Sequence, residues 1–140
     1  MSTIHQFEDI QSWKEARELN NTIGLLIDEE RFKKNFRLVS QIEGSAGSIM
    51  DNIAEGFERS GNKEFMQFLY IAKGSCGELR SQLYRAIDRK YITQKEFESF
   101  TNQTLMISKL IQKINKLLNN SDFKGAKYKE RSNGSNNLKP

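Results

Sequence analysis

Residues 38–88 read LVSQIEGSAGSIMDNIAEGFERSGNKEFMQFLYIAKGSCGELRSQLYRAID and contain two apolar stripes at helical spacing. The first stripe is Leu38, Ile42, Ala46, Ile49, Ile53 and Phe57, and the second is Phe65, Phe68, Leu69, Ala72, Cys76, Leu79, Leu83 and Ile87. Apolar residues three or four apart form one face of a helix. Because Ser60, Gly61 and Asn62 interrupt the pattern, the stretch predicts a helical hairpin whose second helix is capped by Asn62.

Two further stripes flank this hairpin. Trp13, Ala16, Leu19, Ile23, Leu26 and Ile27 predict a helix over about residues 9–28, and Phe97, Phe100, Ile107, Ile111, Ile114 and Leu118 predict another. Thr93 and Glu96 have the spacing of a capping box at the start of that last helix. Short links between long helices make neighbouring helices antiparallel. We therefore predict an all-α, antiparallel up-and-down four-helix bundle over residues 1–119.

The whole-chain composition agrees with this fold class. The chain has 140 residues, enough for one domain, with 36% apolar and 29% charged residues, as amphipathic helices require. No run approaches the roughly 20 apolar residues that cross a bilayer. The first residues, MSTIHQFEDIQSWKEA, lack the basic-then-apolar order of a signal peptide, and the single cysteine cannot form an internal disulfide. We expect a cytoplasmic protein without a membrane partner.

Both hairpin helices contain small residues at mid-length, at 44–48 and 74–77. The two clusters lie about equally far from Gly61, so they meet in an antiparallel hairpin. Interior glycines lower helix stability by about 1 kcal/mol relative to alanine, which closer packing offsets. We predict a close backbone approach here; the alternative is that the glycines break the helices.

The sequence offers little for catalysis. Its one histidine, His5, lies near the terminus, and there is no Gly-rich phosphate loop and no Cys/His cluster with metal-ligand spacing. Cys76 falls on an apolar face, where a buried thiol is expected. Asp51 and Glu55 form a carboxylate pair at helical spacing, but without a partner base. We predict no enzyme, no cofactor and no metal.

Charge is divided unevenly along the chain. Residues 1–60 contain 7 Lys/Arg and 11 Asp/Glu, a net −4, whereas residues 61–140 contain 15 and 7, a net +8. A basic half attracts polyanions such as RNA or DNA, although solvated helix faces and a soluble tail also explain it.

The basic half supplies the candidate nucleic-acid-binding residues. These are Lys73, Arg80, Lys109, Lys113, Lys116, Lys124, Lys127, Lys129 and Arg131. Tyr70 and Tyr84 lie on the same side of the helix as Lys73 and Arg80. Aromatic rings next to cations suit nucleic-acid binding and a subunit interface equally. The lysines bind phosphate without reading sequence, or form a solvated face. Residues 120–140 lack periodicity and are expected to form a flexible basic tail.

A polar stripe accompanies the apolar one in the first hairpin helix. It comprises Gln41, Ser45, Ser48, Asn52, Glu55 and Arg59. One interpretation is that Asn52 and Glu55 hydrogen-bond between helices or subunits and fix the register. The other is a row that faces a ligand.

Residues 41–88 resemble the bacterial four-helix-bundle family named for intervening sequences of 23S rRNA, also called the S23 ribosomal protein family. The matching residues are Ser48-Ile49, Asn52-Ile53-Ala54-Glu55-Gly56, Arg59, Lys63-Glu64-Phe65, Phe68-Leu69, Ala72, Gly74-Ser75, Glu78-Leu79, Gln82-Leu83 and Tyr91-Ile92. Trp13 and Ala16 resemble the family's opening helix, so the resemblance covers roughly residues 7–118 and leaves only the tail outside. Among the motif residues, Ser48, Asn52, Glu55, Gly56, Arg59, Gly74 and Glu78 are assigned an interface or structural role.

The resemblance implies a homo-oligomer, pentameric in several relatives, without catalytic activity. The fold is also similar, more remotely, to the accessory protein of diversity-generating retroelements, which implies a positively charged barrel that engages nucleic acid and a reverse transcriptase. The sequence departs from the family pattern at Glu43 and Gly44, where two basic residues are common. If those basic residues contact nucleic acid in relatives, Glu43 and Gly44 are not expected to make the same contact here.

Two hypotheses of function follow. The leading one is a non-catalytic, oligomeric protein that binds structured RNA through a multivalent basic surface. The alternative is a homo-oligomeric scaffold for an unidentified protein partner, without nucleic-acid binding.

Overall fold

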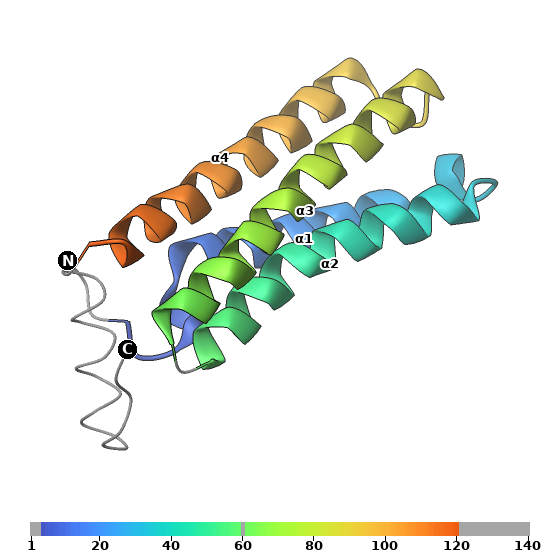
Figure 1. The fold of residues 1–140 in the computed structure, drawn as a ribbon. Helices are drawn as coiled ribbons and strands as arrows, with labels where there is room; N and C mark the ends of the chain where they lie inside the picture. The colour runs from blue at the N-terminus through green and yellow to red at the C-terminus, as the bar shows by residue number, and fades with distance from the viewer. Residues whose placement is uncertain (1–3, 60, 121–140) are drawn as a thin grey trace.

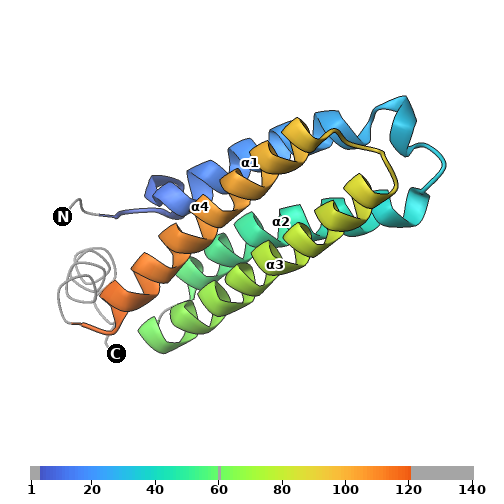
Figure 2. The same ribbon diagram turned by 90° about the horizontal axis from the view of Figure 1, so that it is seen from above.

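Four long helices form the described part of the chain, residues 4–59 and 61–120 of a computed structural model. They are α1 (Gln11–Ile27), α2 (Phe36–Glu58), α3 (Asn62–Asp88) and α4 (Gln94–Leu118). Two short 3-10 turns, η1 (Phe7–Asp9) and η2 (Glu30–Phe32), precede α1 and α2. The helices run side by side (Figures 1 and 2), with α3 packed against both α2 and α4, and α1 against the same two helices. The predicted all-α four-helix bundle is confirmed.

The helix ends differ from the prediction in two places. The capping role of Asn62 is wrong, because α3 already includes Asn62 and the extended residue Gly61 occupies the N-cap position. The first helix begins at Gln11 rather than Asp9. The Asp9 carboxylate accepts the backbone N–H groups of His5 (3.0 Å) and Gln6 (3.2 Å), which closes a separate turn before Ile10 becomes extended.

The predicted capping box at α4 is confirmed. Thr93 Oγ1 accepts the N–H of Glu96 at 3.1 Å, and the Glu96 carboxylate accepts the N–H of Thr93 at 2.9 Å. The two bonds satisfy backbone donors that the first turn of a helix leaves without partners. The sequence pattern therefore placed the start of α4 correctly.

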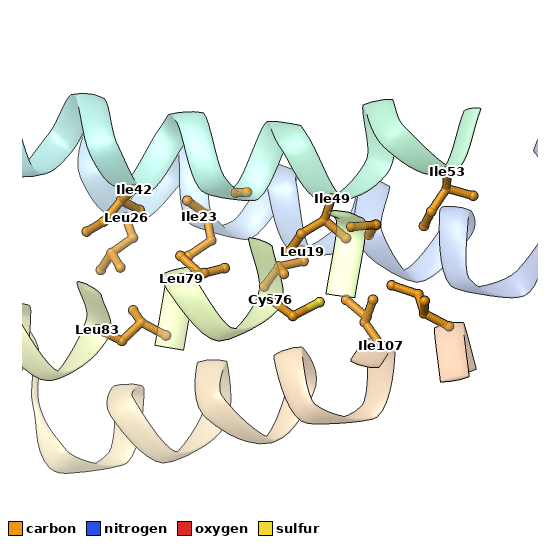
Figure 3. Close-up of a cluster of buried hydrophobic side chains, with 14 of the residues drawn as sticks. Leu19, Ile23, Leu26, Ile42, Ile49, Ile53, Cys76, Leu79, Leu83 and Ile107 are labelled. Carbon is orange, nitrogen blue, oxygen red and sulfur yellow. The ribbon is translucent and has the colours of Figure 1, made fainter. Parts of the chain in front are cut away.

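All four helices contribute to one apolar core. Leu19 and Ile23 of α1, Ile49 of α2, Leu79 of α3 and Ile107 of α4 point toward the same interior (Figure 3) and are buried. Several residues of the predicted stripes are only half-buried at the margin of this core: Trp13, Phe68, Ile87, Phe97, Phe100 and Ile114. The apolar stripes thus identified the inward face of each helix, but they also included residues that lie at the margin of the core.

The two small-residue clusters meet between α2 and α3 as predicted, but the glycines do not make the contact. A β-carbon added to Gly44, Gly47, Gly74 or Gly77 would meet nothing within 4 Å. Both helices nevertheless run unbroken through these positions, so the helix-break alternative is wrong. Contact between the two small-residue clusters is made by serines, since Ser75 Oγ lies 2.9 Å from Ser48 Oγ. Their equal distance from the turn correctly placed the clusters at 44–48 and 74–77 side by side, but their glycines face away from the neighbouring helix.

Gly56 is the glycine that the α2–α3 contact requires. A β-carbon there would lie 2.6 Å from Cβ of Phe68 and 3.0 Å from Cδ1 of Phe65. Because atoms cannot approach to 2.6 Å without displacement, a side chain at position 56 would push the hairpin apart near its turn.

Candidate nucleic-acid interface

A cleft of about 430 Å³ between α3 and α4 contains two of the predicted phosphate-binding lysines. Lys73 reaches it from α3 and Lys116 from α4. The antiparallel packing of these helices brings together residues that lie far apart in the sequence. Tyr70, Gln112, Asn115 and Asn119 complete the lining that the described residues provide, which contains cations, amides and an aromatic ring but no carboxylate.

The other candidate cations lie outside the cleft lining. Lys109 and Lys113 are exposed on α4, while Arg80 is half-buried on α3. The Nε atom of Arg80 is buried without a hydrogen-bond partner in the described chain. Lys124, Lys127, Lys129 and Arg131, with the predicted tail, lie outside the described residues.

The two tyrosines that accompany these cations differ in environment. The ring of Tyr84 packs edge-on against Phe97, with centroids 4.7 Å apart, and therefore helps to join α3 to α4. Tyr70 is 57% exposed at the cleft. Only Tyr70 offers a ring to a ligand from this cleft.

The candidate basic residues of α3 and α4 differ in their charge partners from three other cations of the bundle. Arg31, Lys33 and Arg59 pair with carboxylates at 2.7–3.4 Å. Among residues 4–59 and 61–120, no ion pair joins a carboxylate to Lys73, Arg80, Lys109, Lys113 or Lys116. Their charge is available to an external anion.

The polar stripe of α2 divides into two parts. Gln41, Ser45 and Ser48 line a groove of about 550 Å³ with Gly44 and, from α3, Glu78, Ser81, Gln82 and Arg85. Two bonds cross this groove region, Arg85 Nη1 to Gln41 Oε1 (2.8 Å) and the Ser48–Ser75 contact. This part of the stripe faces a shallow polar groove between helices.

The second part of the stripe bonds within α2. Asn52 Nδ2 donates to the carbonyl oxygen (2.8 Å) and Oγ (2.9 Å) of Ser48, and Arg59 Nη2 donates to Glu55 at 3.0 Å. Asn52 and Glu55 thus do not bond between helices of the bundle, and their predicted bonding between subunits stays a prediction. Arg59 reaches α3, where its Nη1 donates to Glu64 at 3.4 Å and its guanidinium lies over the Phe68 ring at 5.0 Å.

Sequence reasoning missed two buried amides, Asn115 and Gln82. Asn115 is 4% exposed, and neither side-chain polar atom has a hydrogen-bond partner in the described chain. It follows Ile111 by four residues and precedes Leu118 by three, so it occupies a core position of α4. A polar residue in an apolar stripe was the signal that could have identified it. Gln82 lines the α2–α3 groove and has an unpaired Oε1.

In the described part of the chain, metal-ligand side chains are not grouped and the cysteine thiol is buried. Within 4–59 and 61–120, no three His, Cys, Asp or Glu side chains are grouped as metal ligands. Burial raises the pKa of the Cys76 thiol to about 12, although Lys73 and Arg80 oppose that rise. The same part of the chain contains no helix with the length and apolar character of a bilayer span.

The sequence matches the family model for 23S rRNA-intervening sequence protein over residues 8–113. The chain belongs to this family. The match to the 23S rRNA-intervening sequence proteins confirms the resemblance carried by residues 41–88 and spans parts of all four helices.

A solved structure supports the same assignment. The chain is similar to a protein with unknown function from the S23 ribosomal protein family of Bacteroides thetaiotaomicron, at 29% sequence identity and a TM-score of 0.70. The match covers 75% of this chain and 95% of that protein. A search of curated proteins finds no match.

Proposed function

We propose that this member of the 23S rRNA-intervening sequence family is a non-catalytic, cytoplasmic homo-oligomer that binds RNA. The observation that supports the proposal most directly is the set of basic residues on α3 and α4 without carboxylate partners. Lysines of this kind neutralise backbone phosphates and release counterions, which gives affinity without sequence readout. In an oligomer, each additional subunit increases avidity by the same contacts.

Salt-dependent RNA binding tests the proposal. Affinity for a structured ribosomal RNA fragment and for a control duplex is measured from roughly 50 to 300 mM salt, with oligomer mass recorded alongside. Reversing the charge of Lys109, Lys113 and Lys116 to Glu is expected to reduce the slope of log affinity against log salt by about 1 for each lysine.

A matched variant controls for the change of net charge. Lys14, Lys34 and Arg37 are also exposed, but they lie on α1, its connection to α2, and the start of α2. Changing these three residues to Glu alters the net charge by the same amount as the α4 variant does. The affinity for RNA is expected to fall less than it does in the α4 variant. Equal losses in both variants would contradict a binding surface on α4, and no wild-type binding at the lowest salt would contradict the proposed function.

A protein-interaction scaffold is the second candidate. It is favoured by apolar side chains that face solvent, with Phe36 81% exposed and Leu25 73% exposed, and by the open α2–α3 groove. Exposed apolar side chains suit contacts between proteins. A stable oligomer that binds no RNA at any salt concentration is the result that this candidate predicts.

A further inference from the structure

We propose that the α3–α4 cleft binds one unpaired nucleotide of single-stranded RNA, with Lys73 and Lys116 at the phosphate, the Tyr70 ring stacked on the base, and the Asn115 amide hydrogen-bonded to the base edge. The inference rests on the proposed RNA binding and adds a defined site to it. A protein with this site prefers an RNA strand with splayed-out bases to a continuous duplex.

Asn115 carries the argument for a specific ligand. Its side chain is buried at the cleft while its Nδ2 and Oδ1 atoms lack partners in the described chain. A buried polar group without a hydrogen bond destabilises the fold, so packing alone favours leucine at this core position. A side-chain amide presents a donor and an acceptor next to each other, which complements the donor–acceptor edges of nucleobases.

Tyr70 supplies the surface on which a base can stack. Its ring is largely exposed and lines the same cleft as Asn115. Aromatic side chains stack on bases of any identity, and removing the ring weakens binding. A stacked base whose edge faces Asn115 would therefore be held both by its face and by its edge.

The charge of the cleft fits the phosphate of the same nucleotide. Lys73 and Lys116 approach from different helices, and none of the six lining residues is acidic. The side chain of each lysine is long and flexible, so the ammonium groups can follow a phosphate. The Nδ2 and Oδ1 atoms of Asn115 are buried, so the amide must turn toward the cleft to reach the base edge. The volume of about 430 Å³ falls within the range of small-ligand pockets, roughly 300–1,000 Å³.

Base pairing would prevent this mode of binding. In a continuous A-form duplex the bases are stacked and paired, and proteins contact mainly phosphates and 2′-hydroxyls. Only an unpaired base can present both its face to Tyr70 and its edge to Asn115. The cleft therefore favours loops, bulges and single strands.

Binding of a fluorescent single-stranded RNA of mixed sequence, compared with its blunt duplex, tests the inference. At roughly 100 mM salt we expect Asn115→Leu to weaken single-strand binding by about 5–10-fold and duplex binding by less than about twofold. Tyr70→Ala is expected to weaken single-strand binding by about 5–100-fold, whereas Tyr70→Phe retains it within about twofold because the ring is preserved.

Gln82→Leu is the matched control. Gln82 is also a buried amide with an unpaired oxygen, but it lies in the α2–α3 groove. This variant should bind the single strand as the wild type does. Urea unfolding of Asn115→Leu should show no loss of stability, because the substitution removes unpaired polar atoms from a buried position.

The outcomes separate the site from the general function. Salt-dependent binding that Asn115→Leu and Tyr70→Ala leave unchanged would overturn the nucleotide site while retaining the proposed RNA binding. A wild type that binds neither strand nor duplex at the lowest salt would overturn both. Complete displacement of the strand by equimolar adenosine monophosphate would also overturn the inference, since the cleft would then be a site for free nucleotides.

Discussion

Arg31 and Glu96 form two parallel hydrogen bonds, of 2.8 and 2.7 Å, that join η2 to the first turn of α4. The guanidinium matches the carboxylate in a bidentate geometry, which is stronger than a single contact. The bonds from Arg31 are the largest cause of the lowered pKa of Glu96, about 2. The same carboxylate caps α4 through the N–H of Thr93, so one residue fixes both the start of the helix and its position against the α1–α2 connection.

Arg31→Ala is expected to destabilise the bundle. The Arg31 and Glu96 side chains are 30% and 32% exposed, so water screens part of their attraction, and we expect a loss of about 1–2 kcal/mol in the free energy of unfolding. Urea denaturation followed by circular dichroism measures it. Lys33→Ala is the control, because its pair with Glu30 is far more exposed; it should change stability by less than about 0.5 kcal/mol.

The same pair predicts a defined dependence of stability on pH. The pKa of Glu96 is lowered from 4.5 to about 2 in the folded protein. A lowered folded-state pKa means that the stabilisation is fully present above pH 4.5 and is lost as the pH falls toward 2. The difference in urea midpoint between wild type and Arg31→Ala should therefore shrink across this window. A difference that stays constant down to pH 2 would assign the effect of Arg31 to packing instead.

Gly56→Ala is expected to destabilise the protein, unlike alanine at the outward glycines. The added carbon would collide with Cβ of Phe68, a backbone-attached atom that cannot rotate away, so we expect a loss of about 1–3 kcal/mol. Gly74→Ala has open space and should gain about 0.5–1 kcal/mol from helix propensity. Urea midpoints of the two variants should move in opposite directions, and the same direction for both would contradict the observed packing.

These contrasts show which features the sequence could predict. Apolar spacing and the Thr93–Glu96 pattern depend on neighbours along one helix, so they identified the helices and the cap of α4. Spacing also carried information on the glycines. Gly44 lies two residues from both Ile42 and Ala46, on the side of the helix away from the apolar stripe, so the prediction that the glycines make the contact did not follow from the spacing. The charge pattern along the chain selected the lysines of the candidate surface. The cleft shared by Lys73 and Lys116 depends on how α3 packs against α4, so it became evident only from the structure.

Cys76 is expected to be unreactive in the folded protein. Burial disfavours the thiolate and raises the thiol pKa from 9.0 to about 12. At pH 8 the thiolate fraction should fall about 1,000-fold relative to the unfolded chain, and thiol reagents react with the thiolate. Ellman's reagent should label the protein rapidly in urea and very slowly without it. Rapid labelling of the native protein would indicate that the interface between α3 and its neighbours opens frequently.

Gly44→Leu tests whether the α2–α3 groove is a subunit surface. Gly44 lines the groove, and a β-carbon added there meets no atom of a neighbouring element within 4 Å, so leucine is expected to preserve or improve the helix. If a second subunit packs into the groove, the new side chain occupies its place, and light scattering should show a lower mass than for the wild type.

Gly24→Leu provides the matched control, because Gly24 is equally unobstructed but lies on α1. This variant should keep the mass of the wild type, since it leaves the α2–α3 groove open. An unchanged oligomer in Gly44→Leu would place the subunit contact elsewhere. Equal dissociation of both variants would show that the leucine substitutions weaken the oligomer by an effect that does not depend on this groove. Loss of oligomer in Gly44→Leu alone, together with weaker binding to a multivalent RNA, would connect assembly to the avidity that the proposed function requires.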